Sequence, residues 1–103
     1  MIQFYKGPFS YDKNTISNWN SNVIGIYYLG QANQQGTINV DYVGKATSEQ
    51  GVRGRLLQHI QANEWYGITH FNYCTCSTIK EAEDLEKSEI FKFKPKYNIQ
   101  NKY

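Results

Sequence analysis

Residues 23–43, VIGIYYLGQANQQGTINVDYV, contain the stretch that decides the fold. Residues 23–29 are β-branched and aromatic and are flanked by turn formers, which predicts a buried strand. Residues 31–36 are polar and end in a glycine, so they predict a turn. Residues 37–43 predict a second strand, and the whole stretch is therefore typical of a β-hairpin.

A helix and a third strand are predicted after this hairpin. Apolar residues recur every four positions at Val52, Leu56 and Ile60, which predicts a helix over residues 53–64. Residues 68–76 then have the composition of a strand. The loop between the hairpin and the first helix spans residues 44–51.

A second helix is predicted to begin at Thr78. Thr78 and Glu81 have the spacing of a capping box, in which each satisfies a free N–H group of the first turn. This helix runs to about Phe91, and Pro95 prevents its continuation. The predicted order is β-β-α-β-α, which is an α+β fold with helices packed on a small sheet.

Residues 1–22 are predicted to form an N-terminal extension packed on a core of residues 23–103. A short edge strand is favoured by four aromatic residues, namely Phe4, Tyr5, Phe9 and Tyr11. Asp12 or Asn14 is placed to cap a short helix that ends near Trp19.

Composition narrows the class of protein. The 103 residues make one domain, and an aromatic content of 16% excludes disorder for most of the chain. The longest apolar run is too short to span a bilayer, and no secretory signal is evident. Cys74 and Cys76 are expected to be free thiols packed as small apolar groups. We therefore expect an intracellular, cytoplasmic protein that does not bind a membrane.

One acidic residue stands out in the second helix. Five apolar residues share one arc of it: Ile79, Ala82, Leu85, Ile90 and Phe93. Glu86 falls near the middle of this arc, where an unpaired carboxylate would be costly. Two interpretations are equally supported. In the first, Glu86 forms a buried salt bridge or lies where the edge of the apolar face frays. In the second, it is a metal ligand or a catalytic carboxylate.

Other candidate residues lie on the hairpin and the first helix. Arg55 and His59 are one turn apart on one edge of the helix. The planar guanidinium of an arginine there suits a phosphate. Two solvated polar residues are, however, the more common arrangement on a helix edge. Tyr27 and Tyr42 are ordinary strand residues by position. Lys45 follows a glycine and is placed either to meet an anion or to face solvent.

These residues, in this order, resemble the GIY-YIG nuclease family. The two signatures correspond to residues 25–27 (GIY) and 42–44 (YVG), and the arginine followed four residues later by histidine corresponds to Arg55 and His59. Glu86 matches the metal-binding glutamate of the second helix. Residues 95–98, PKYN, match the closing Pro-x-Tyr-Asn. The resemblance covers about residues 23–98, with a slightly long hairpin loop.

The resemblance implies a three-stranded antiparallel sheet flanked by helices, and hydrolysis of one phosphodiester bond in DNA. Glu86 would hold a single divalent cation, Mg²⁺ or Mn²⁺. The expected catalytic residues are Tyr27, Tyr42, Arg55, His59 and Glu86. Lys45 is expected to touch the nucleic-acid backbone, and Asn98 to fix the end of the chain near the substrate.

The charge and the residues leave three functions to compare. A net charge of +2 permits binding to nucleic acid but does not by itself indicate it. Affinity from charge should be modest. We therefore expect either modest sequence specificity or a protein partner that targets the chain to its substrate. A metal-dependent endonuclease is favoured, because a degenerate domain has no need to keep the matched residues. The alternatives are a non-catalytic nucleic-acid-binding module with the same fold, and a protein-interaction domain that uses its aromatic residues.

Overall fold

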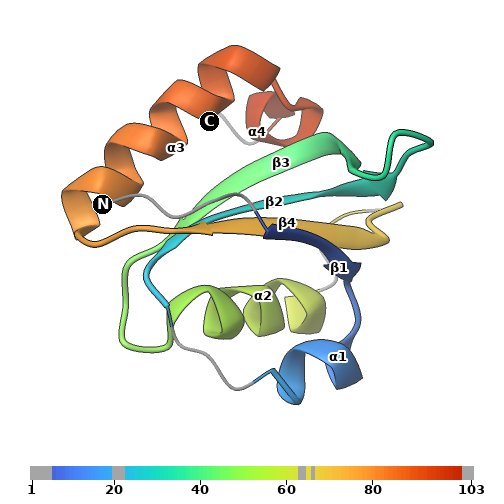
Figure 1. Cartoon of the computed structure of the whole chain (residues 1–103), viewed down its shortest axis with the longest axis horizontal. Coiled ribbons are helices and arrows are strands. Elements are labelled where there is room, and N and C mark those ends of the chain that lie inside the picture. The colour runs from blue at the N-terminus through green and yellow to red at the C-terminus, as the bar shows by residue number, and fades with distance from the viewer. Residues whose placement is uncertain (1–5, 20–22, 63–64, 66, 101–103) are drawn as a thin grey trace.

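The computed structural model describes residues 6–19, 23–62, 65 and 67–100. Figure 1 shows one sheet with helices on both faces. The elements in chain order are β1 (Lys6–Ser10), α1 (Lys13–Ser17), β2 (Gly25–Ala32), β3 (Ile38–Ala46), α2 (Gly51–Ala62), β4 (His70–Thr75), α3 (Ile79–Phe93) and α4 (Lys96–Gln100).

The sheet has four antiparallel strands in the order β1-β4-β2-β3. The α+β class is confirmed, but the prediction of three strands is wrong. The additional strand is β1, which comes from the expected N-terminal extension and pairs with β4. Aromatic packing explains this pairing, since the ring centroid of Phe9 lies 5.4 Å from that of Phe71 and 5.9 Å from that of Tyr73.

The N-terminal helix follows its local sequence signals. Asp12 caps α1, and its side chain accepts a hydrogen bond of 2.8 Å from the Thr15 amide. The edge strand was also predicted, although Phe4 and Tyr5 lie outside the described residues. Tyr11 continues the contact with the sheet, because its N–H donates to the Thr69 carbonyl at 2.9 Å.

The two main helices begin and end near their predicted positions. α2 begins earlier than residue 53, where the Val52 N–H donates to the Val23 carbonyl at 2.9 Å. Thr78 caps α3 as predicted and accepts from the Glu81 amide at 3.1 Å. α3 ends at Phe93 rather than Phe91. The short helix α4 was not predicted, because Pro95 indicated only an end.

Successive side chains of β2 face opposite sides of the sheet, as the pleat requires. Tyr27 and Leu29 belong to the core on the side of α1 and α2. Ile26 and Tyr28 belong to the core on the side of α3. Figure 1 shows these helices above and below the sheet, so adjacent residues of β2 serve two separate surfaces.

An irregularity in β3 changes which residues face each core. Leu29 pairs with Tyr42 and Gly30 pairs with Val40, so Asp41 is an extra residue in β3. A bulge of this kind shifts the alternation of side chains along the strand. As a result Val40 packs on the α3 side, while Tyr42 packs on the α2 side with the predicted site residues.

Cys74 and Cys76 are buried among the apolar residues on the α3 side, as predicted. Burial raises the pKa of both thiols. No helix within the described ranges is long and apolar enough to cross a membrane.

Candidate active site

A cleft of about 270 Å³ opens where the edge strand β3 meets α2 and α3. Tyr42 and Lys45 come from β3, Arg55 from α2 and Glu86 from α3, and all four were predicted as site residues. Thr47 and Ser48, in the loop after β3, complete the lining. Because β3 is the last strand of the sheet, helices on opposite faces can approach each other across its edge.

Two further predicted residues lie behind this cleft rather than in its lining. The Tyr27 hydroxyl and Nε2 of His59 are 2.7 Å apart in a hydrogen bond whose direction depends on the His59 tautomer. Tyr27 is fully buried and His59 is 5% exposed. The ring of Tyr42 connects both to the cleft, with its centroid 6.2 Å from that of Tyr27 and 5.6 Å from that of His59.

Burial controls the protonation of Tyr27. It raises the pKa of the Tyr27 phenol far above its usual value near 10, and the neighbouring Tyr42 acts in the same direction. The Arg55 guanidinium acts in the opposite direction but does not outweigh burial. Tyr27 therefore keeps its proton at neutral pH and acts as a hydrogen-bonding group.

Gly44 makes room for the Tyr27 ring. The two residues are paired across β2 and β3. A Cβ atom on Gly44 would lie 2.4 Å from Cζ of Tyr27 and 2.5 Å from its hydroxyl oxygen. Only a residue without a side chain permits this close approach, which gives the glycine of the second signature a packing role.

Glu86 is the cleft's carboxylate, and its half-buried position agrees with its place on the helix. Burial raises its pKa, while the cations of Lys45 and Arg55 lower it and Glu83 raises it further. The predicted apolar arc around it is only partly buried, since Ala82 is buried but Ile79 is 48% exposed. Glu86 is thus half-buried on α3 and lines the cleft.

Lys45 and Arg55 both have partners within the protein. Lys45 Nζ forms an ion pair of 3.3 Å with Glu83 Oε2, one turn from Glu86. Arg55 Nη1 donates to Gln58 Oε1 at 2.7 Å. Arg55 is half-buried and His59 is buried, so the interpretation as two solvated residues does not hold for His59.

Asn98 is occupied by main-chain hydrogen bonds. Its Oδ1 accepts from the Val43 N–H at 2.7 Å, and its Nδ2 donates to the Val43 carbonyl at 2.9 Å. The edge strand β3 would otherwise leave these two groups without a neighbouring strand. Asn98 therefore fastens the C-terminal segment to β3 beside the cleft, and its amide is not directed at a substrate in this conformation.

Sequence reasoning missed Trp65 and Glu83. The ring centroid of Trp65 lies 4.4 Å from that of Tyr42 and 4.7 Å from that of His59, and Tyr97 stacks on it at 5.7 Å. No spacing rule links Trp65 to these residues. Glu83 could have been found, because it lies three residues before Glu86 and so shares its face of the helix.

The residues of the cleft suit a divalent cation whose other ligands include the phosphate oxygens of a substrate. Within the described parts of the chain, no three His, Cys, Asp or Glu side chains are grouped to hold a metal by themselves. Mg²⁺ is often bound through only one or two carboxylates, with water and phosphate oxygens as its other ligands. Glu86, with Glu83 close enough to influence its pKa, meets that lower requirement.

Comparisons of the chain with models of protein families, with curated proteins and with solved structures find no match.

Proposed function

We propose that this protein is a divalent-metal-dependent endonuclease that hydrolyses a phosphodiester bond in DNA. The observation that supports this most strongly is the composition of the cleft at β3. Two cationic side chains, a half-buried carboxylate and a tyrosine converge there from three elements. This set suits a phosphate diester, since cations neutralise its oxygens and a carboxylate can hold a metal. The resemblance to the GIY-YIG nucleases points the same way.

Arg55 and Lys45 would bind the phosphate. The planar guanidinium of Arg55 can donate two parallel hydrogen bonds to phosphoryl oxygens and neutralise the charge that develops on them. Lys45 now pairs with Glu83, so substrate phosphate would compete with that carboxylate for its ammonium. Lys45 would thus be paired with Glu83 in the free protein and with phosphate when the substrate is bound.

Tyr42 would orient the attacking water, because its side chain lines the cleft. Tyr27 and His59 would act as positioning residues, since both are buried and are linked to the cleft through Tyr42. This division differs from the expectation that Tyr27 and His59 are themselves catalytic residues. It follows from the burial of Tyr27, whose high pKa also opposes a role as a free phenolate.

Glu86 would hold Mg²⁺ or Mn²⁺, and Glu83 is the nearest residue able to assist it. When bound, such a cation would polarise the scissile phosphate and stabilise the leaving oxygen. The raised pKa of the Glu86 carboxyl is consistent with a group that gains from a positive charge beside it. With a net charge of +2, DNA binding should be modest, so a targeting partner would supply specificity.

The test is nicking of supercoiled plasmid at low salt with Mg²⁺ or Mn²⁺. Wild type should nick only with metal, and Glu86→Ala and Arg55→Ala should each lose activity about 100-fold or more. Asp84→Ala and Arg53→Ala are matched controls on the same helices, outside the cleft lining, and should remain active. Equal nicking by all five proteins would contradict the proposed site.

A non-catalytic nucleic-acid-binding module is the second candidate. One observation favours it, namely that Glu86 is the single carboxylate among the described residues that line the cleft. If wild type binds DNA without nicking plasmid, flap or branched substrates under any metal, this second function replaces the first. Calorimetric titration of Mn²⁺ into wild type and Glu86→Ala then shows directly whether the carboxylate holds a cation.

A further inference from the structure

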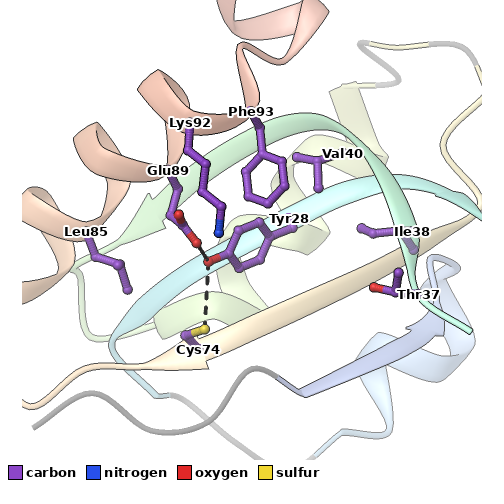
Figure 2. Close-up of a pocket in the computed structure, with 9 residues that line it drawn as sticks. All are labelled: Tyr28, Thr37, Ile38, Val40, Cys74, Leu85, Glu89, Lys92 and Phe93. Atoms are coloured by element: carbon purple, nitrogen blue, oxygen red, sulfur yellow. Dashed lines mark hydrogen bonds between the residues drawn. The ribbon is translucent and has the colours of Figure 1, made fainter. Parts of the chain in front are cut away.

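A second and larger cavity, of about 460 Å³, lies between α3 and the sheet (Figure 2). None of the described residues that line it also lines the cleft at β3. The cavity lies on the α3 side of the sheet, where Tyr28 contributes to it, whereas the cleft at the edge of β3 also draws on Arg55 of α2. Its volume is within the range of about 300–1,000 Å³ that is typical of small-molecule sites.

The walls of this cavity are mostly apolar. Ile38 and Val40 of β3 form one side, and Leu85 and Phe93 of α3 form the other. Figure 2 shows these side chains directed into a common space from the strand and from the helix. Phe93 is 40% exposed, so this wall is open to a ligand from solution.

One carboxylate in the cavity is held in a defined position. The Tyr28 hydroxyl donates to Glu89 Oε1 at 2.5 Å and also lies 3.8 Å from Cys74 Sγ. Tyr28 is only 1% exposed, so its position is set by the core. The hydrogen bond therefore orients the half-buried Glu89 towards the interior of the cavity (Figure 2).

A cation of the chain itself already occupies the aromatic side of the cavity. Nζ of Lys92 lies 5.0 Å from the centroid of the Phe93 ring, a cation–π arrangement. The Phe93 ring in turn meets Tyr28 edge-on at 6.1 Å and 81°. Lys92 is exposed and carried on a flexible stem, and no ion pair joins it to Glu89 in the described residues.

We propose that this cavity binds an organic amine, whose ammonium group replaces that of Lys92 between Glu89 and Phe93. The apolar body of the amine would lie against Ile38, Val40 and Leu85. An amine is favoured over a carboxylate because the anchored charge in the cavity is the acid, whereas the base is free to move into solvent. The inference stands apart from the proposed nuclease activity, which uses the separate cleft at the edge of β3.

Calorimetric titration of the full chain with 2-phenylethylamine tests the proposal. 2-Phenylethanol and 3-phenylpropionate are matched probes that keep the aromatic body and change only the charged group. The amine should bind saturably, and both other probes should bind about tenfold more weakly or less, because they forfeit the ion pair and the cation–π contact. Equal binding of the three would show a plain apolar cavity and overturn the proposal, as would no binding of the amine.

Two substitutions should move the affinity in opposite directions. Glu89→Gln keeps an acceptor for Tyr28 but removes the charge, and should weaken amine binding about tenfold. Lys92→Met removes the resident cation and should strengthen it. Lys87→Met and Asp84→Asn are controls on exposed positions of α3, and circular dichroism verifies folding of each variant. Unchanged or weaker binding by Lys92→Met would contradict the exchange of ammonium groups, whatever the nicking assay shows.

Discussion

The Tyr27 hydroxyl lies 2.7 Å from Nε2 of His59, and both side chains are buried although 32 residues separate them. The bond ties the interior strand β2 to α2, which also carries Arg55. A buried polar pair of this kind is costly to break, because the remaining group stays out of water without its partner. The orientation of the candidate active site thus depends on a contact beneath it.

Tyr27→Phe should lower the free energy of unfolding by about 1–3 kcal/mol, because buried Nε2 of His59 loses this hydrogen bond. Nicking should fall by about tenfold or more, since misplacing Tyr42 and Arg55 impairs their alignment with the phosphate. Urea unfolding and the plasmid assay measure the two effects.

Tyr28→Phe is the matched control, because it removes a buried hydroxyl from the next residue of the same strand. It should lower the free energy of unfolding while leaving nicking unchanged, since its hydroxyl bonds Glu89 in a separate cavity and Tyr28 does not line the cleft. If both variants lose activity in proportion to stability, Tyr27 has no special relation to the site.

Gly44→Ala should disturb the Tyr27 ring, because the new methyl group would lie 2.4 Å from its Cζ atom. Overpacking of this kind costs about 1–3 kcal/mol. In a Tyr27→Leu background the same substitution should cost less, since no ring occupies the space. A double-mutant cycle by urea unfolding measures the coupling, and equal costs in both backgrounds would refute the steric account.

Glu86 should make a pH-dependent contribution to stability. Its folded pKa is raised above the unfolded value of about 4.3, so the folded state binds the proton more tightly. The favourable contribution is complete below the unfolded pKa and is lost as the pH rises through the folded pKa. In the absence of metal, Glu86→Gln should therefore be more stable than wild type at pH 7, and the difference should shrink towards pH 4.

Urea unfolding of the two proteins from pH 4 to pH 7 measures this difference and cancels the titration of the shared acidic groups. Partial exposure of the side chain keeps the effect modest. A Glu86→Gln protein that is less stable than wild type at pH 7 without metal would show that the Lys45 and Arg55 cations outweigh burial.

Asn98→Ala should lower the free energy of unfolding by about 1–3 kcal/mol, because the two main-chain groups of Val43 lose their partners at the sheet edge. Hydrogen exchange should quicken at the Val43 amide in particular. Asn98→Asp keeps the acceptor for that amide and should protect it better than alanine does. Unchanged exchange at Val43 in Asn98→Ala would mean that the C-terminal segment is not fastened there.

Asn72→Leu should raise the free energy of unfolding by about 1 kcal/mol or more. Asn72 is fully buried in β4, and neither polar atom of its amide has a hydrogen-bond partner in the described structure. Leucine has a similar size and no polar group to leave unsatisfied. Thermal unfolding followed by circular dichroism measures the change, and a loss of stability would point to an ordered water on the amide.

Local chemistry accounts for the features that were predictable from sequence. Asp12 and Thr78 cap their helices because a cap needs only a short polar side chain within three residues of a free N–H. The hairpin was evident from β-branched and aromatic residues around a polar turn. Its strands extend further than predicted, to Ala32 and Ala46, because pairing with neighbouring strands outweighs weak local propensity.

The candidate site was predictable only in part. Tyr42, Arg55 and Glu86 were selected by resemblance, and helix geometry also selected Glu86. Their convergence at one cleft could not be derived from spacing, because it requires α2 and α3 to meet across the edge of β3. Trp65 gave no signal, since stacking on Tyr42 depends entirely on how a distant segment returns to the sheet.

The sequence by itself determined the class of fold, the capped starts of α1 and α3 and the residue types available for chemistry, because these depend on neighbours a few positions apart. Tertiary structure alone decided that the predicted edge strand pairs with β4, that Tyr27 lies behind the cleft, and that Lys45 meets Glu83. It also created the cavity beside Glu89 between α3 and the sheet. These features depend on packing between segments that are far apart in the chain, for which local propensity carries no information.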